Sequence, residues 1–502
     1  MPNSVINLAD SGSLPIESPL FQRVVNTDAA VIVIYAAVNI ALIASTNPYV
    51  YPIDDAYITL HNAQVLWSGV DPNYNVPALV GATSLVHLFL VAMFLPLYGG
   101  LAPAIVGFLG GVTYLIGVRR IGTSFGLSRS QQGLLLVVAA GAGSVFYQLT
   151  NGLETGWTLA AVTWAIVLAS SQRPSSFLAV ICGLLPFVRP ELAALSASLL
   201  LRQFYLRTKS GYPAAIASDI ALAACAFAPW LAWIWIETGA ALLGTADAKV
   251  AFFAEERLGL LVKLGRATIG VLTGLGPIAI APFLAKRSSL SVALSAFCCV
   301  FFLAFALKFP GGLFHNWNRY TYALLPCCLW ALSACRETRP RTFKIALLSL
   351  ALSAPLTFSL SVYREIEGQA VVRDAFKAAA WTNANIAPDQ GLLTHDAGVI
   401  AYATKNPLAD LVGLKTPGSV AVHMRWTLPS AGRDRAQAIG EIADGSRFHY
   451  AMIRRDPEEY WSALADDLRQ EGWGLTPVRE PSIPVDGYVI FRLAPPSATP
   501  PG

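Results

Sequence analysis

Long apolar runs separated by short polar segments dominate the first 361 residues of the chain. A transmembrane helix needs about 20 mainly apolar residues, so runs near this length predict membrane-spanning helices. The pattern gives twelve candidates, several of them short or broken by Pro and Gly, at residues 28–48, 81–97, 101–118, 133–149, 156–170, 176–188, 191–203, 214–236, 266–285, 289–307, 320–335 and 343–361. The predicted core is therefore an all-α, polytopic transmembrane bundle.

Basic residues in the short loops predict the orientation of these helices, because Lys and Arg favour the cytoplasmic side. Four loops carry them, with Arg119, Arg120 and Arg129 in one, Arg202, Arg207 and Lys209 in the next, Lys286 and Arg287 in the third, and Arg336, Arg339, Arg341 and Lys344 in the last. With a cytoplasmic N-terminus, the other loops and the tail lie outside, which requires an odd number of spans. Residues 81–97, a short run containing His87 and Pro96, are interpreted as re-entrant or interfacial. The prediction is eleven spans.

The polar tail has a different pattern, in which helix-like and strand-like segments alternate. Residues 365–386 and 456–470 predict helices, whereas residues 391–394, 408–412, 448–453 and 488–493 predict strands. They indicate a small α/β domain outside the membrane. The predicted organisation is a cytoplasmic segment (1–27), a transmembrane core (28–362) with its first outer loop at 49–80, the α/β domain (363–494) and a disordered tail (495–502).

The composition supports a polytopic membrane protein and excludes a soluble enzyme. Hydrophobic residues make up 55% of the chain and charged residues only 13%, against about 25% charged in soluble proteins. The net charge of +4, without a run of Lys and Arg, predicts no nucleic-acid surface. The sequence contains no P-loop or dinucleotide-type Gly-rich motif, so no nucleotide is expected as a ligand.

Asp54 and Asp55 in the first outer loop are the clearest candidates for catalysis. A carboxylate there can act as a general base and remove the proton of an attacking sugar hydroxyl. From spacing alone, a solvated loop or the N-cap of the next helix is slightly the better interpretation. The sequence indicates no certain cofactor. Whether a divalent cation (Mg²⁺, Mn²⁺ or Ca²⁺) binds the two carboxylates stays open, because two ligands do not make a metal site.

Further polar residues collect at the ends of spans on the same side as this loop. Charges beside the bilayer are costly, so such groups favour a polar cavity. An Arg or Lys in it can hold a phosphate, and Arg does so with two hydrogen bonds. The structural alternatives are snorkelling to the interface for Arg319 and an ion pair between Arg189 and Glu191. The substrate-binding candidates are His61, Glu154, Arg189, Glu191, Lys249, Asn318, Arg319 and Tyr320, joined from the tail by His395 and Asp396.

The order of several short motifs resembles that of the GT-C superfamily of membrane glycosyltransferases. The motifs are DDAYIT from Asp54, NGLET from Asn151, VRPE from Val188, a Thr and a Lys four residues apart at Thr245 and Lys249, NRY from Asn318, HDAG from His395 and DLVGL from Asp410. Within that superfamily, the chain is most similar to bacterial proteins related to terminal arabinofuranosyltransferases. The likeness covers about residues 28–415.

This resemblance implies a polyprenyl-phosphate sugar donor, no nucleotide, and a site on the outer face of a bacterial inner (plasma) membrane, toward the periplasm or cell exterior. It maps the base onto Asp54, with Asp55 as a possible substitute, and places Arg319 and Lys249 at the donor phosphate. The expected reaction is an inverting transfer of a pentose or hexose to a glycan, lipid or protein acceptor in the cell envelope.

One segment departs from the family pattern, which bears on the sugar. Family members often have G-Y-T-S-P-x-W where this chain has GATSLVH from Gly81, so its aromatic residues are missing and arabinose is not assumed. A secondary transporter or lipid flippase is the alternative, but it predicts charges near mid-bilayer and internal repeats. A scaffold for envelope assembly would leave the two Asp residues unexplained.

Overall fold

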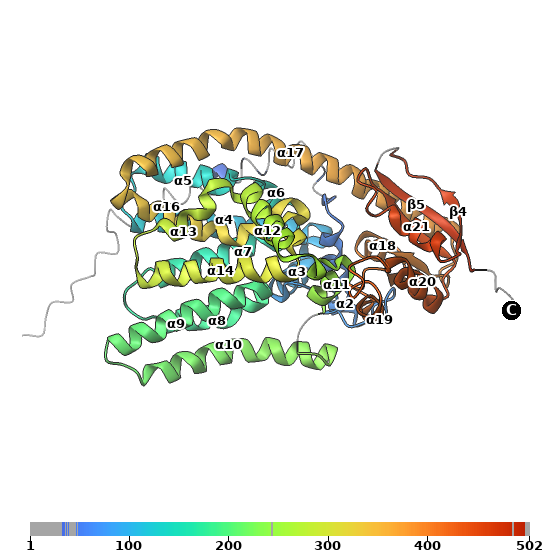
Figure 1. Ribbon diagram of the computed structural model, residues 1–502, viewed down its shortest axis with the longest axis horizontal. Coiled ribbons are helices and arrows are strands. Elements are labelled where there is room, and N and C mark those ends of the chain that lie inside the picture. Colours follow the sequence, from blue (N-terminus) through green and yellow to red (C-terminus); the bar gives the residue numbers. More distant parts are fainter. Residues whose placement is uncertain are drawn as a thin grey trace, which may run out of the picture.

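The computed structural model describes residues 33–35, 37, 39, 47, 49–241, 244–483 and 486–496. The predicted cytoplasmic segment 1–27, most of the first predicted span at 28–48 and residues 497–502 of the predicted tail lie outside the described residues. Within the described part, a bundle of helices occupies one end of the molecule and a smaller domain with a sheet occupies the other (Figure 1).

The bundle is built from helices of very different lengths. Its helices are α2 (Asp55–Ser68), α3 (Leu85–Tyr98), α4 (Ala102–Ser124), α5 (Arg129–Gly141), α6 (Val145–Thr150), α7 (Thr155–Ala169), α8 (Ser176–Val188), α9 (Ala193–Lys209), α10 (Ala215–Thr238), α11 (Thr245–Phe253), α12 (Leu260–Leu275), α13 (Ala281–Leu284), α14 (Ser289–Lys308), α15 (His315–Asn318), α16 (Leu325–Thr338) and α17 (Pro340–Asn385). Short 3₁₀ turns join them at Gly99–Leu101, Pro190–Leu192, Glu255–Arg257, Gly276–Ile280, Pro310–Phe314 and Thr321–Leu324.

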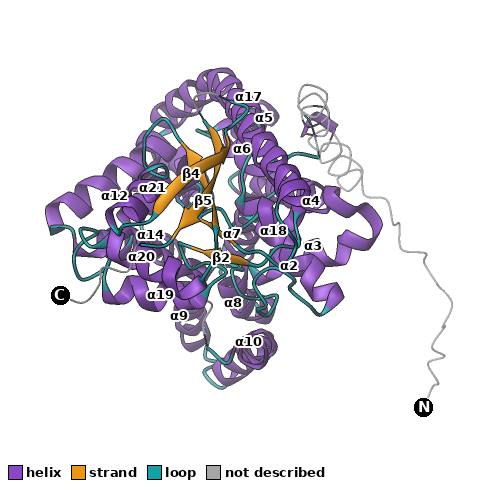
Figure 2. Ribbon diagram, turned by 90° about the vertical axis from the view of Figure 1, so that its right-hand side faces the viewer, coloured by secondary structure: helices purple, strands orange, loops and turns teal. Residues whose placement is uncertain are grey.

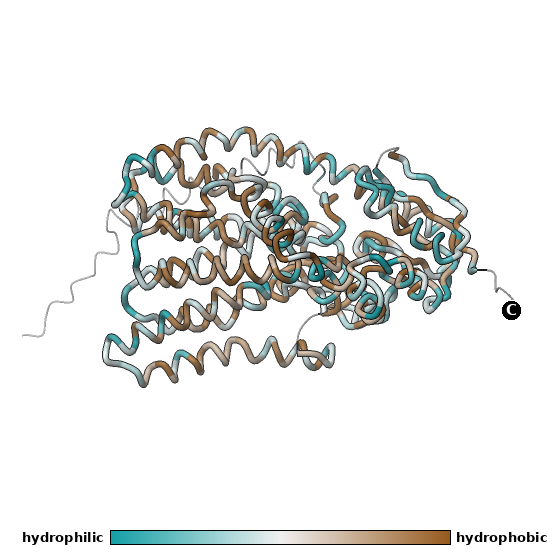
Figure 3. Tube along the Cα trace, in the orientation of Figure 1, coloured by the Kyte–Doolittle hydropathy of each residue, from teal (hydrophilic) through white to brown (hydrophobic). Residues whose placement is uncertain are grey.

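Several of these helices suit a bilayer, and the chain is a multi-pass membrane protein. Five segments among the described residues are long and apolar enough to cross a membrane: Leu85–Ser124, Ala215–Thr238, Leu260–Leu284, Ser289–Lys308 and Pro340–Asn385. The helices Thr155–Ala169 and Ser176–Val188 are apolar but shorter. Apolar residues follow the helices, and hydrophilic ones gather in the connecting loops and the smaller domain (Figure 3). The count of eleven spans stays a prediction.

The predicted re-entrant or interfacial segment 81–97 contains all of α3 except its last residue, Tyr98. This helix has 14 residues and is about 21 Å long at 1.5 Å per residue, shorter than a hydrocarbon core of about 30 Å. A 3₁₀ turn connects it to α4, whose 23 residues extend for about 35 Å and can cross alone. The connections α9–α10, α13–α14 and α16–α17, which carry predicted cytoplasmic basic loops, lie at the end of the bundle away from the sheet (Figure 1).

A single helix, α17, joins the bundle to the C-terminal domain. The sequence predicts a span at 343–361 and a separate helix at 365–386, but the structure has one helix of 46 residues through both. Neither Gly nor Pro interrupts the junction near 362, so nothing in the backbone forces a break there. In Figure 1, α17 runs along the edge of the bundle and reaches the sheet.

The C-terminal domain contains a five-stranded mixed sheet in the order β2-β1-β3-β5-β4. Its strands are β1 (Leu392–Thr394), β2 (Leu408–Asp410), β3 (Tyr450–Arg455), β4 (Gly474–Arg479) and β5 (Gly487–Ala494), with helices α18 (Val399–Ala403), α19 (Pro417–Arg425), α20 (Arg435–Ser446) and α21 (Ala463–Gln470). Strand β1 pairs in parallel with β2 and β3, whereas β5 pairs antiparallel with β3 and β4. Figure 2 looks onto this sheet, with the bundle behind it.

The first outer loop and the C-terminal domain pack tightly together. Lys415 is fully buried, and its Nζ lies 3.1 Å from Asp71 Oδ2 and 2.8 Å from Asn62 Oδ1. Backbone contacts add to this, since the amide of Leu408 donates to the carbonyl of Asn73 at 2.9 Å. Buried charges are stable only when paired and hydrogen-bonded, so these contacts fix the domain over one end of the bundle.

Candidate functional site

A polar cavity lies where the bundle meets the C-terminal domain. It lies between α2, the turn before α3, the loop before α7, α11 and the segment before α16, and it is partly open to the surroundings. Its walls comprise Asp55, Ile58, Thr59, Asn62, Gly81, Ala82, Thr83, Ser84, His87, Leu88, Leu153, Glu154, Lys249, Arg319 and Leu414. Leu414 belongs to the C-terminal domain, so both parts of the chain form this cavity.

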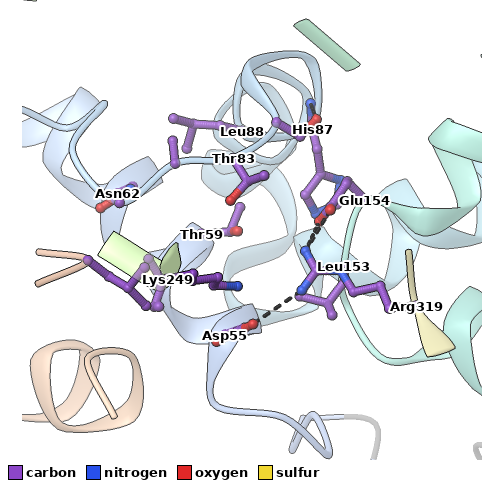
Figure 4. A pocket seen from close by; sticks show the side chains of 15 residues that line it. Asp55, Thr59, Asn62, Thr83, His87, Leu88, Leu153, Glu154, Lys249 and Arg319 are labelled. Carbon is purple, nitrogen blue, oxygen red and sulfur yellow. Dashed lines mark hydrogen bonds and ion pairs between the residues drawn. The ribbon is translucent and has the colours of Figure 1, made fainter. Parts of the chain in front are cut away.

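Asp55 presents its carboxylate to the cavity from the first residue of α2. Arg319 Nη1 lies 3.1 Å from its Oδ2, and the side chain of Asp55 keeps 26% of its surface accessible, against 4% for Arg319. Figure 4 shows the carboxylate directed toward Arg319, with Lys249 nearby. Asp55 is therefore an anionic group that can be reached from the cavity and is held by a buried cation.

Glu154 and two arginines form the buried wall behind Asp55. Glu154 accepts hydrogen bonds from Arg319 at 2.5 and 2.6 Å and another from Arg189. Burial alone would raise the pKa of Glu154, but Arg319 and Arg189 outweigh it and hold that pKa well below its usual value. Arg189 also pairs with Glu191 at 2.5 Å. The predicted Arg189–Glu191 ion pair therefore exists and is extended by Glu154 to Arg319.

Lys249 enters the cavity from α11. Its Nζ lies 3.1 Å from the hydroxyl of Tyr320, and no carboxylate within the described ranges forms an ion pair with it. Tyr320 in turn packs its ring against the guanidinium of Arg189, 4.4 Å from the ring centroid. A half-buried ammonium without an acidic partner is suited to bind an anion.

Asp54 faces away from the cavity, toward the C-terminal domain. Its Oδ2 accepts the amide of Gly398 at 2.7 Å, and its Oδ1 accepts the amide of Val399 at 2.6 Å. Loss of water contact and the nearby Asp396 raise the pKa of Asp54 well above its usual value, although the two amides oppose this shift. Asp54 thus binds the start of α18 in the C-terminal domain, whereas Asp55 contacts Arg319 at the cavity.

The other predicted site residues stand outside the cavity lining. His61 bonds to Asp71 at 3.1 Å, and the amide of Asn318 donates to Gly270, Thr273 and Leu313. His395 stacks on Trp461 with the ring centroids 4.5 Å apart. Of the predicted residues, the cavity brings together Asp55, Glu154, Lys249 and Arg319; Arg189, Glu191 and Tyr320 support them from behind.

Asp396 lies beside His395 in the C-terminal domain. Its Oδ2 accepts the hydroxyl of Tyr488 at 2.5 Å. Burial would raise the pKa of Asp396, but the adjacent ring of His395 outweighs burial and lowers that pKa to about 2. Asp396 therefore belongs to the interior of the domain near Asp54, not to the cavity.

Two threonines of the cavity were missed by sequence reasoning. Figure 4 shows the side chains of Thr59 and Thr83 near each other in the view of the cavity. Thr59 lies one helical turn after Asp55, so helical spacing from the Asp pair could have found it. Thr83 belongs to the GATS segment that replaces the aromatic family pattern. Hydroxyls in this arrangement can donate to or accept from a polyhydroxylated ligand.

The described residues include no cluster of three His, Cys, Asp or Glu side chains that could hold a metal ion. The two carboxylates proposed for a divalent cation also have different partners, since Asp54 binds backbone amides and Asp55 binds Arg319. Whether a cation binds therefore stays open, as it does from the sequence.

An apolar groove adjoins the polar cavity along α2 and α3. Leu66, Trp67, Phe89, Ala92, Met93, Pro229, Trp230 and Trp233 line it. The first turns of α2 and α3 face the polar cavity, while residues further along the same helices face the groove. A ligand with a polar head and an apolar chain would find both environments on one helix pair.

Comparison with solved structures identifies the fold. ArnT from Cupriavidus metallidurans bound to undecaprenyl phosphate aligns with a TM-score of 0.56 and 11% identity, over 92% of this chain and 97% of that one. The same protein in the apo state aligns with a TM-score of 0.52 and 12% identity, over 93% and 98%. The fold is of the GT-C type. The sequence resemblance implied this superfamily; a special closeness to arabinofuranosyltransferases stays a prediction.

Residues 362–489 match a family model described as Domain of unknown function (DUF8728). No curated protein matches the chain.

Proposed function

We propose that this protein is an inverting membrane glycosyltransferase that uses a polyprenyl-phosphate sugar as its donor. One observation carries the proposal: in a single cavity, the accessible carboxylate of Asp55 stands near an ammonium, Lys249, that has no acidic partner among the described residues. The fold shared with a protein bound to undecaprenyl phosphate supports the donor class. The acceptor is a glycan, lipid or protein of the cell envelope.

In this mechanism Asp55 is the general base. It removes the proton of the acceptor hydroxyl as the oxygen attacks the anomeric carbon. The bond from that carbon to the phosphate oxygen breaks on the opposite face, and the phosphate leaves with the electron pair, still attached to its lipid. A single displacement inverts the anomeric configuration. The sequence resemblance maps the base onto Asp54, but the position of Asp55 in the cavity favours the second carboxylate.

Cationic side chains would stabilise the departing phosphate. Lys249 supplies a charge that no carboxylate of the described residues neutralises, and Arg319 adds a second cation held by Glu154. Preorganised charges act most strongly where charge develops during the reaction, which here is the leaving phosphate. Glu154 is then a structural partner of Arg319, because both of its oxygens already accept hydrogen bonds from that residue.

The chemistry of the walls supports a position for the sugar and the prenyl chain of the donor. Thr59 and Thr83 offer hydroxyls to the sugar, and the adjoining groove lined by Trp67, Trp230 and Trp233 offers an apolar surface to the prenyl chain. By this proposal, the cavity faces the outer side of a bacterial inner membrane, in keeping with the basic loops at the far end of the bundle.

The test is transfer by the purified protein in lipid nanodiscs. Polyprenyl phosphates carrying a pentose or a hexose are supplied with envelope glycan, and product is measured by mass spectrometry with Asp55→Asn as the control. Sugar transfer lost in Asp55→Asn supports the proposal. If the wild-type protein instead moves the lipid donor across liposome membranes without transfer, and Asp55→Asn does the same, the protein is a flippase or transporter and the proposal fails.

A further inference from the structure

Asn316 contacts the same oxygen of Asp55 that Arg319 contacts. Asn316 Nδ2 lies 3.3 Å from Asp55 Oδ2, and Arg319 Nη1 lies 3.1 Å from it. In the described part of the chain, no donor forms a hydrogen bond with the other oxygen, Oδ1. A carboxylate held at one oxygen and free at the other has a fixed orientation, with Oδ1 left for a ligand.

The backbone that carries Asn316 is strained. Asn316, Trp317 and Asn318 have φ angles of 47°, 57° and 65°. Left-handed residues other than Gly cost on the order of 1–2 kcal/mol each, with Asn among the most tolerant. Three in succession persist only when neighbouring groups hold them. One such group is Arg364, whose guanidinium lies 3.9 Å from the ring centroid of Trp317.

Both ends of this turn are fixed by hydrogen bonds from separate elements. At one end, Gln148 of α6 donates from Nε2 to the carbonyl of Asn316 at 2.6 Å. At the other end, the amide of Asn318 donates to the carbonyls of Leu313 at 2.8 Å and Gly270 of α12 at 3.0 Å. The direction of the Asn316 side chain is therefore set by contacts outside the turn.

Gln148 is itself held by the loop that carries Glu154. Its Oε1 accepts the amide of Asn151 at 3.0 Å, and Oδ1 of Asn151 accepts the backbone amide of Leu153 at 3.1 Å. Gln148 and Asn151 are fully buried. A chain of hydrogen bonds thus connects the NGLET loop with the strained turn and, through Asn316, with Asp55.

We infer that Asn316 is a positioning residue that orients the carboxylate of Asp55 toward the acceptor, an inference that rests on the proposed function. The strain of the turn is tolerated because it places this amide at Oδ2. Asn suits the position for two reasons: it accepts a positive φ, and its side chain supplies the donor. The charged or titratable groups that face Asp55 are Arg319, Lys249, Asp54, His315 and Tyr147.

Three substitutions distinguish the effect of losing the hydrogen bond from the effect of changing the backbone strain. Asn316→Gly keeps the left-handed conformation but removes the donor, whereas Asn316→Ala removes the donor and adds strain. Asn316→Asp keeps the shape and puts a second carboxylate beside Asp55. The matched control is Asn75→Gly, since Asn75 is exposed, has a φ of 54° and lies outside the cavity.

For Asn316→Gly we expect kcat for transfer to fall about tenfold, with an unchanged KM for the lipid donor and an unchanged melting temperature. In Asn316→Ala, kcat should fall by the same factor, and the melting temperature should also be lower. In Asn316→Asp the acidic limb of the pH–rate profile should move upward by on the order of one unit, because neighbouring carboxylates disfavour joint ionisation. Asn75→Gly should match the wild type. Wild-type kcat in Asn316→Gly, or losses that follow the folded fraction alone, would overturn the inference.

A second measurement keeps this test independent of the proposed function. The rate at which a carbodiimide labels Asp55 follows the protonated fraction of its carboxyl, and mass spectrometry reads it without any sugar donor. The midpoint of labelling against pH should move upward in both Asn316→Gly and Asn316→Asp. Absence of transfer in the wild type would refute the glycosyltransferase, whereas unchanged midpoints would refute the role of Asn316.

Discussion

Asp54 and Asp55 are adjacent in the chain, but their carboxylates bind to different parts of the molecule. Asp54 accepts the backbone amides of Gly398 and Val399 in the C-terminal domain, while Asp55 contacts Arg319 beside the cavity. One carboxylate therefore joins the two domains, and its neighbour is available to a ligand.

This difference predicts that Asn at position 55 mainly lowers the rate of transfer, whereas Asn at position 54 mainly lowers stability. Asp55→Asn should slow transfer by about a hundredfold to ten-thousandfold, the usual cost of losing a general base, with little change in melting temperature. Asp54→Asn, the matched control, should lower stability by about 1–3 kcal/mol, because Asn has one acceptor oxygen for the two amides of Gly398 and Val399 and leaves one of them without a partner; it should reduce the rate far less. Initial rates and thermal unfolding in the same detergent measure both. A larger rate loss in Asp54→Asn at unchanged stability would contradict the assignment.

Much of the architecture follows from the sequence pattern. Apolar runs located the helices of the bundle, and the strand-like segments at 391–394, 408–412, 448–453 and 488–493 correspond to β1, β2, β3 and β5. Strand β4 was missed because it is mostly exposed, contains Pro477 and lies at the sheet edge, so it lacks the alternation that marks a strand. The continuity of α17 was missed because a change of composition was interpreted as a boundary.

The site was harder to predict because its residues come from distant parts of the chain. Sequence reasoning found Asp55, Glu154, Lys249 and Arg319 but could not choose between two adjacent Asp residues, since that choice depends on where the C-terminal domain docks. The sequence placed Asn316 beside Arg319 but did not predict its role, because that role arises from a strained backbone conformation that only tertiary contacts impose.

Lys249 should matter for binding the donor and not for folding. Its one side-chain hydrogen bond among the described residues is to Tyr320, so Lys249→Met removes a charge and little else. We expect kcat/KM for the lipid donor to fall about tenfold to a hundredfold, since one charge-assisted contact contributes about 1.5–3 kcal/mol. Lys405→Met, at an exposed position outside the cavity lining, is the control. Equal kinetics in the two variants would exclude Lys249 from the phosphate site.

Glu154 should be required for stability as well as activity. Glu154→Gln leaves two buried arginines short of a countercharge, and breaking a buried ion pair from one side costs about 3–5 kcal/mol. Arg189 and Arg319 keep their contacts with Glu191 and Asp55, which places the expected loss near the lower end of that range.

Chemical or thermal unfolding measures the effect of Glu154→Gln. The control is Glu480→Gln, which removes an exposed ion pair with Arg455 and should change stability by less than about 1 kcal/mol. A melting temperature for Glu154→Gln equal to that of the control would show that the buried cluster is not ionised as the geometry implies.

His423 should make the C-terminal domain sensitive to acid. Its ring is fully buried, with Nε2 2.7 Å from the carbonyl of Leu411 and Nδ1 2.7 Å from the hydroxyl of Thr427. Burial lowers the pKa of His423 to about 4, against about 6.5 in an unfolded chain. A histidine kept neutral in the fold contributes its stability fully above the unfolded pKa and loses it as pH falls toward the folded pKa. The expected loss between pH 6.5 and 4 is about 3 kcal/mol.

Thermal unfolding of the full chain between pH 7.5 and 4 tests this expectation. Other groups also titrate in that range, so the informative quantity is the difference between variants. His423→Gln should be less stable than the wild type at pH 7.5 but lose less stability on acidification, because its side chain cannot take up a proton. The exposed His449→Gln should retain the wild-type slope. If His423→Gln and the wild type lose stability in parallel from pH 6.5 to 4, the buried histidine is not the acid-sensitive group.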